Sequence, residues 1–204
     1  LGVSLALGLS AGAAAVVLNV TAVAPSADTR LTVWPRGRPR PVASSLNAPA
    51  GSTVAALVTV PVGPGGVVDL RNQAGGTHVV VDVVGWYGNG PGVGGSLVPV
   101  APTRLLDTRQ SGETPLGPGE ARALAVAGGA VPEDATAVLL NLTAVAPDAA
   151  THLTAWPSGV DRPNASSLNV ARGATVANAA LVGVGAGGTV TVRNQSGSVD
   201  LVVD

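Results

Sequence analysis

The chain has 204 residues, of which 46% are hydrophobic and 11% are charged, and its formal net charge is −1. This balance excludes a disordered chain, since disorder goes with low hydrophobicity and high charge. It also provides no long-range field to attract nucleic acid or an anionic membrane, so we expect neither as a partner. The lack of cysteine excludes disulfides, thiol catalysis and zinc–thiolate sites.

Short runs of Val, Leu and Thr, divided by Gly, Pro, Asn and Asp, predict an all-β protein. No run reaches about 18 apolar residues, so no membrane span is expected. The strands predicted in the first half are 3–9, 15–23, 29–34, 53–62, 66–71 and 77–84. One face of 15–23 is uniformly apolar and should lie in the core. Its residues are Val16, Leu18, Val20 and Ala22.

A glycine-rich segment, GNGPGVGGS at 88–96, has the composition of a flexible linker between two domains. The strands predicted after it are 97–100, 104–108, 121–127, 137–145, 151–156, 174–184, 188–193 and 199–204. PGG at 64–66 and AGG at 186–188 provide the positive-φ residues of tight hairpins. The predicted organisation is a first repeat at 1–88, a linker at 89–96 and a second repeat at 97–204.

The two halves of the chain repeat one another. An offset of 122 aligns residues 13–82 with 135–204 without a gap, and 41 of these 70 positions are identical. The shared phrases include AVAP, ASSLN and RNQ. A period of about 120 residues is the size of a small domain, so we expect tandem β-sandwiches, either Ig-like or jelly-roll-like.

The two copies differ in phase. The first lacks a counterpart of 96–122, and the second stops at Asp204 where the first continues VVGWYG. Two explanations stay open at this point. Either the chain is a window on a longer array, or neighbouring molecules supply the missing strands, as in a strand-exchanged fibre.

Two carboxylates each end an apolar run, where an unpaired buried charge would be costly. An arginine is the ordinary partner, and the phrase PTRLLDTR offers two of them with an aspartate between. The Asp-x-Asp-x-Asp spacing of a calcium loop is absent, so we predict a structural ion pair and no metal. The candidates are Asp82, Asp204, Arg104, Asp107 and Arg109, with Arg71 and Arg193 as further possible partners.

Trp34 and Trp156 occupy equivalent positions, each on the more polar face of its strand. Exposed, they would form platforms on which sugar rings stack. The alternative is that each packs against its own sandwich, because tryptophan is usually largely buried. The two histidines, His78 and His152, do not align with one another, so a shared metal site or triad is not expected.

No enzyme is predicted, because the chain has no GxSxG, no HExxH and no phosphate-binding loop. No cofactor is predicted either. The succession PTRLLDTR, AVLLNLTAVAP, LTAWPSG, ASSLN, GATVANAALV and VVDVVGWYG resembles a repeated module of secreted and surface proteins of actinobacteria. That module often occurs in tandem, sometimes beside peptidase or amidase domains.

The resemblance implies an extracellular accessory or architectural domain. We therefore expect a structural module that serves as a stalk, spacer or fibre subunit, with adjacent repeats or other copies of the chain as partners. Strand exchange between neighbours is one way in which such a subunit would assemble. The alternative is a glycan- or cell-wall-binding accessory module of a secreted hydrolase, with cell-wall polysaccharide as its partner.

Overall fold

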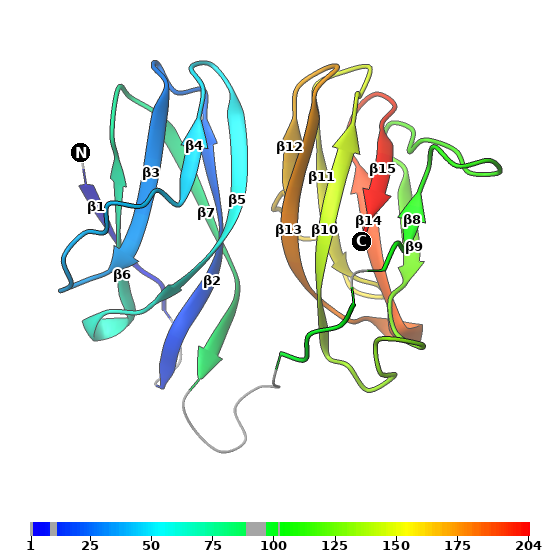
Figure 1. Ribbon diagram of the computed structural model, residues 1–204, viewed down its shortest axis with the longest axis horizontal. Coiled ribbons are helices and arrows are strands. Elements are labelled where there is room, and N and C mark those ends of the chain that lie inside the picture. The colour runs from blue at the N-terminus through cyan, green and yellow to red at the C-terminus, as the bar shows by residue number, and fades with distance from the viewer. Residues whose placement is uncertain (1, 9–11, 89–96, 102) are drawn as a thin grey trace. The chain divides into compact units, whose positions relative to one another are not determined.

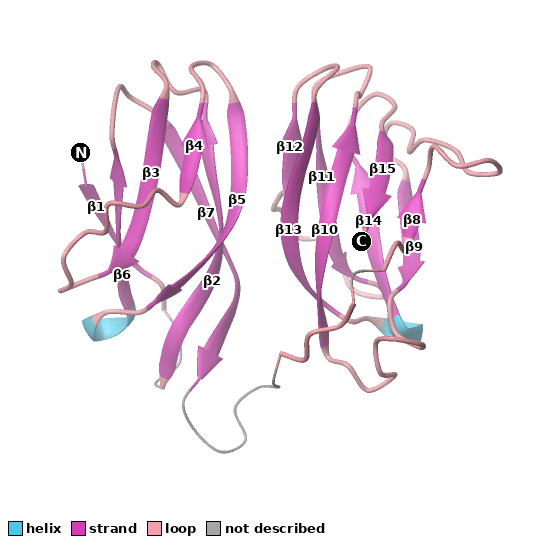
Figure 2. Cartoon of the chain, viewed as in Figure 1, coloured by secondary structure: helices cyan, strands magenta, loops and turns pink. Residues whose placement is uncertain are grey.

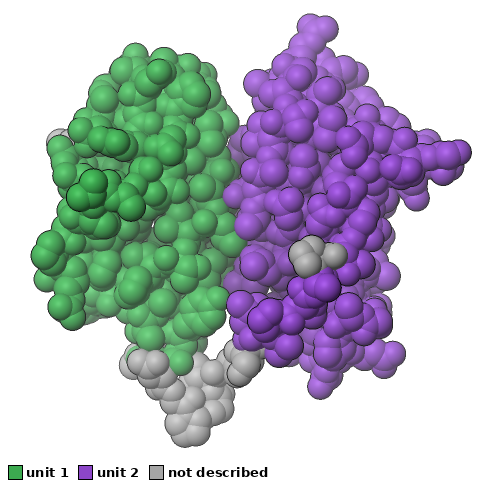
Figure 3. Space-filling view, in the orientation of Figure 1, with its two compact units in different colours: residues 1–95 green, residues 96–204 purple. Residues whose placement is uncertain are grey.

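The computed structural model describes residues 2–8, 12–88, 97–101 and 103–204, and it is an all-β protein (Figure 1). The chain divides into two compact units, Leu1–Gly95 and Ser96–Asp204, which are coloured separately in Figure 3. The predicted linker at 89–96 lies outside the described residues. The helices of the described part are two single turns, Pro64–Gly66 and Ala186–Gly188 (Figure 2). Neither has the length or the apolar content to cross a membrane.

Unit 1 is a sandwich of two antiparallel sheets. One sheet has the order β1 (Gly2–Ala6), β6 (Val67–Asn72), β3 (Thr29–Pro35) and β4 (Leu46–Ala48). The other has the order β5 (Thr53–Pro61), β2 (Ala13–Val23) and β7 (His78–Gly88). Buried side chains from both sheets form one hydrophobic cluster, so the core lies between the sheets.

Unit 2 repeats this arrangement strand for strand. Its first sheet has the order β12 (Leu168–Val170), β11 (Thr151–Pro157), β14 (Thr189–Asn194) and β9 (Ala121–Ala125). Its second has the order β13 (Thr175–Gly183), β10 (Ala137–Val145), β15 (Asp200–Val203) and β8 (Leu106–Asp107). The register also repeats, since Leu31 pairs with Leu46 as Leu153 pairs with Leu168. Among the described residues, the one strand of unit 2 without a counterpart in unit 1 is β8, which lies beside β15.

The predicted core face of β2 is confirmed. Its four residues, Val16, Leu18, Val20 and Ala22, are all 0% exposed. The cluster of buried residues in each unit consists of Leu, Val and Ala alone. Burying one Val or Leu side chain contributes about 1.5–3 kcal/mol, so each core depends on many small contributions instead of a few aromatic ones.

Three predictions about the elements need correction. Residues 97–100 form no strand, because Pro99 has no N–H to donate to a ladder. The short strands β4 and β12 were not predicted, since three residues are too few to show a period. The turns at 64–66 and 186–188 have the predicted positive-φ glycines, but each joins strands of different sheets, so neither closes a hairpin.

Each of these turns approaches another segment of backbone at a glycine. A Cβ atom on Gly63 would overlap the backbone N and O of Arg36, and one on Gly185 would overlap the same atoms of Ser158. Both glycines have ordinary negative φ values, so it is the space that requires glycine here, and not the dihedral angle.

The substitution Gly63→Ala should therefore lower the free energy of unfolding of unit 1 by about 2 kcal/mol or more, since backbone must move to admit the methyl group. Gly76→Ala is the matched control in the same unit, because its Cβ would meet only Ser26 Oγ at 4.0 Å. Urea unfolding followed by tryptophan fluorescence measures both. Equal stability of the two variants would contradict the close approach.

Candidate functional site

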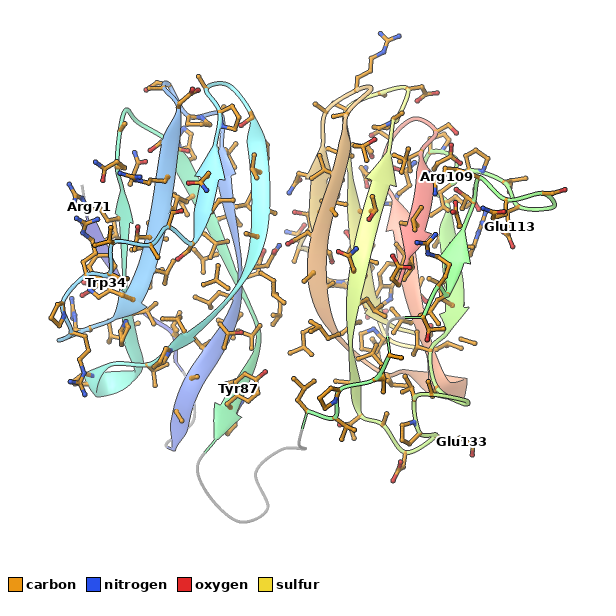
Figure 4. The ribbon with its side chains drawn as sticks, in the orientation of Figure 1. Trp34, Arg71, Tyr87, Arg109, Glu113 and Glu133 are labelled. Atoms are coloured by element: carbon orange, nitrogen blue, oxygen red, sulfur yellow. The ribbon has the colours of Figure 1, made fainter. Side chains whose placement is uncertain are left out.

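Asp107 lies at the centre of an ion-pair network in unit 2, and its side chain is 4% exposed. The Arg109 guanidinium binds it in a bidentate manner, with Nε donating to Oδ1 at 2.7 Å and Nη2 to Oδ2 at 2.7 Å. Arg104 Nη1 donates to Oδ2 at 3.1 Å, and Arg104 Nε donates to Asp204, which directly follows β15. The structure thus brings together four of the five residues named from the sequence (Figure 4 labels Arg109).

This geometry determines the electrostatics of the cluster. Hydrogen bonds from Arg109 hold the pKa of Asp107 well below its usual range, against the opposite effect of burial. The hydrogen bond to Asp204 raises the pKa of Arg104, and the bond to Asp107 raises the pKa of Arg109. The fold therefore favours the charged forms of Asp107, Arg104 and Arg109.

Backbone and hydroxyl bonds attach the same segment to β15. Leu105 N–H donates to Val203 O at 2.8 Å, and Thr108 N–H donates to Leu201 O at 3.0 Å. The Thr108 hydroxyl accepts from Leu201 N–H at 2.8 Å and donates to the Asp200 carboxylate at 2.8 Å. The segment RLLDTR therefore holds the two-residue edge strand β8 on β15 through both backbone hydrogen bonds and ion pairs.

Asp82, the counterpart of Asp204 on β7, is placed differently. Among the described residues no arginine pairs with it, and the one ion pair of unit 1 joins Arg36 to Asp69 at 3.5 Å. Arg71, the further partner considered, lies on β6 in the opposite sheet (Figure 4). Burial raises the pKa of Asp82. The predicted ion pair thus forms at Asp204, whose partner Arg104 lies in the segment that precedes β8. It does not form at Asp82, because the described part of unit 1 contains no equivalent segment.

The two tryptophans also differ. Trp156 is 9% exposed, and its indole N–H donates to Val160 O at 3.1 Å. This burial leaves no open ring face, so Trp156 is not a platform for a sugar. Trp34 is partly exposed on β3, on the same face of the sheet as Arg71 (Figure 4). A stacking surface common to both units is therefore absent from the described residues.

Sequence reasoning missed the asparagine of the repeated phrase RNQ. Asn194 is 0% exposed, and its amide donates to Leu116 O, Gly117 O and Gly197 O while its Oδ1 accepts from the Thr151 hydroxyl at 2.7 Å. In unit 1, Asn72 accepts from Thr29 at 2.6 Å and donates to two turn carbonyls. The sequence signal for this asparagine is that the phrase RNQ is the same in both copies.

The serine of ASSLN was missed in the same way. Ser45 Oγ accepts from Val33 N–H at 3.0 Å, and Ser167 Oγ accepts from Ala155 N–H at 3.0 Å. The backbone N–H groups of these serines donate to Leu31 and Leu153 at 2.8 Å. A serine side chain thus continues the ladder beyond β4 and β12, satisfying a donor that would otherwise be unpaired.

No group of three or more His, Asp or Glu side chains in the described part of the chain is arranged to hold a metal ion. His152 is partly buried, and desolvation together with Arg162 and Arg193 lowers its pKa. No protein-family model, curated protein or solved structure matches this chain.

The ion cluster generates a prediction about stability. Asp107→Asn should lower the Tm of unit 2 by about 5 °C or more, because two arginines lose the charge that they share. Asp82→Asn should leave the Tm of unit 1 within about 3 °C, since it removes no ion pair. Tryptophan fluorescence can follow each unit separately. In a Trp34→Phe/Trp86→Phe background the signal comes from Trp156 in unit 2, and in a Trp156→Phe background it comes from Trp34 and Trp86 in unit 1. A larger effect at Asp82 would contradict this assignment.

The two units should also respond to acid in opposite directions. The lowered pKa of Asp107 stabilises unit 2 above about pH 4, the value of an unfolded aspartate, and this stability is lost as the pH falls further. A backbone hydrogen bond from Gly117 lowers the pKa of Glu120 and adds to the effect. The raised pKa of Asp82 means that its protonation favours folded unit 1. Urea titrations from pH 6 to pH 3 (roughly the carboxyl range) with the same reporters measure the two slopes, and Asp107→Asn should flatten that of unit 2.

Proposed function

We propose that this chain is a non-catalytic structural repeat module that acts outside the cell as a stalk, spacer or fibre subunit. One observation carries the proposal. Several polar residues of the repeated phrases form the same hydrogen bonds inside both units, and the buried cluster of each unit draws on aliphatic residues of those phrases. A module selected for a ligand would instead be expected to direct part of its shared sequence toward an open surface.

The shared polar residues illustrate this. Asn72 and Asn194 bind the equivalent turn in each unit, and Ser45 and Ser167 extend the equivalent sheet. The Thr32 hydroxyl donates to Ala43 O at 3.5 Å, and the Thr154 hydroxyl donates to Ala165 O at 3.0 Å. By contrast, the polar surface differs between units. Arg36 pairs with Asp69 where Ser158 shares a 2.8 Å hydrogen bond with Thr191. These internal bonds are the same in both units, whereas this surface pair differs, which supports an architectural role.

The location outside the cell rests on the resemblance to secreted actinobacterial modules. The low charge and the absence of cysteine are compatible with it. Glycan binding is the weaker alternative, because the buried Trp156 cannot take part in a stacking surface that both units share.

Force spectroscopy on the intact chain tests the spacer role. Two separate sandwiches should give two unfolding events, each releasing about 30 nm of contour length for roughly 85 to 105 residues at about 3.5 Å each. A chain that extends without resistance would contradict the proposal.

Glycan titration tests the alternative. Adding soluble cell-wall fragments to the chain should leave the tryptophan fluorescence unchanged, and the response of Trp34→Ala should be identical. A saturable shift that Trp34→Ala abolishes would favour glycan binding over the structural role.

A further inference from the structure

The outer edge of β7 in unit 1 corresponds to the edge of β15 that carries β8 in unit 2. Residues 79–82 read VVVD and 201–204 read LVVD. Both strands pair on their inner side with the equivalent strand, since Val20 is opposite Val81 as Leu142 is opposite Val203. The sheet orders place β7 at an edge and β15 between β10 and β8.

Unit 2 shows what this edge binds. Val203 lies opposite Leu106 and Val202 opposite Asp107, with backbone hydrogen bonds of 2.8 to 3.0 Å on either side. Arg104 reaches along the strand to Asp204. The recognition therefore has two parts, a backbone ladder and one carboxylate at the end of the receiving strand.

Unit 1 has the same receiving groups in an open state. Val80 is 49% exposed, whereas Val202 at the equivalent position is 5% exposed. The Asp82 carboxylate has no arginine partner among the described residues, and burial raises its pKa. In the described part of unit 1 no strand pairs with β7 on the side away from β2. An edge strand with unpaired backbone groups is a template for a further strand.

We propose that the outer edge of β7, at residues 79–82, binds an extended peptide segment with the pattern Arg-Leu-Leu-Asp-Thr-Arg, supplied from outside unit 1. This inference rests on the proposed structural function and names the partner chemistry of its assembly. The first arginine of the segment pairs with Asp82. The Asp–Arg pair that follows covers Val80, and the ladder forms to Val79 and Val81.

The receiving edge differs between the units at Val79, where unit 2 has Leu201, and at the residue before it. Asp200 accepts the Thr108 hydroxyl in unit 2, and His78 occupies the equivalent place in unit 1. The unprotonated nitrogen of an imidazole can accept a hydrogen bond from a hydroxyl, as a carboxylate oxygen does. The threonine of the incoming segment therefore retains an acceptor.

The occupant is a segment that is free to pair, and not residues 104–109 of a second copy. In this chain those residues already bind their own β15. Moving residues 104–109 to another molecule would break their bonds to β15 of their own unit. It would also replace an intramolecular partner, which has a high effective concentration, by an intermolecular one. A segment of the same pattern without such a partner has no such cost.

The test is binding of a labelled peptide, TRLLDTRQS (residues 103–111), to the intact chain, measured by fluorescence anisotropy. We expect one peptide per chain and slowed amide exchange at Val79 and Val81. Asp82→Asn should weaken binding by about fivefold, as should alanine for the first arginine of the peptide, and the two changes together should cost little more than either alone. Asp69→Asn, on the opposite sheet of unit 1, is the matched control and should leave the affinity unchanged.

Three results would overturn the proposal. One is no binding. Another is protection at Leu201 and Val203 instead, which would mean that the peptide replaces β8. The third is self-association of the chain alone that the peptide reverses, which would make a second copy the occupant. The force measurement is independent of the peptide, so two intact unfolding events with no peptide binding would remove this site and leave the structural function in place.

Discussion

Each unit depends on one constraint: a core made only of aliphatic side chains must hold two sheets in register. The buried clusters contain only Leu, Val and Ala, whose packing contributes many small terms and specifies no loop geometry. Buried polar side chains supply that specification. Asn194 gathers three carbonyls, and Thr151 binds it in turn. Because a buried amide without partners is costly, this network admits one arrangement of the turns.

The edge strands follow from the same constraint. A two-residue strand such as β8 cannot stay in place through its backbone bonds alone, and the Arg104–Asp107–Arg109 cluster adds charge-assisted bonds that hold it on β15. The units therefore differ in how this edge is treated. In unit 2 the segment at 104–109 covers it, whereas in the described part of unit 1 no strand covers the corresponding residues of β7. The uncovered edge of β7 is therefore the part of unit 1 to which we propose that a further strand binds.

Features that depend on neighbouring residues could be predicted from the sequence, and features that depend on distant residues could not. The core face of β2 was predictable because alternation along one strand reveals it. Arg104, Asp107 and Arg109 lie within six residues, so their proximity was also predictable. Asp82 shares with Asp204 its position at the end of an apolar run, and this local pattern predicts an arginine partner for both. The arginine that pairs with Asp204 precedes β8, and the described part of unit 1 contains no such segment. The burial of Trp156 depends on Val160 and its loop, whose path no local pattern reveals.

The sequence by itself determined the all-β class, the repeated domain and the aliphatic core, because strand alternation and internal identity are properties of the chain alone. Only the tertiary structure decided which carboxylate finds an arginine and which tryptophan is buried. It also decided that Ala24 and Ala146 adopt left-handed φ values of 46° and 43°, where a sequence pattern would favour glycine. Their N–H groups donate to Ser52 and Ala174 across the turn. Such features depend on residues far apart in the chain, which meet only once both sheets have formed.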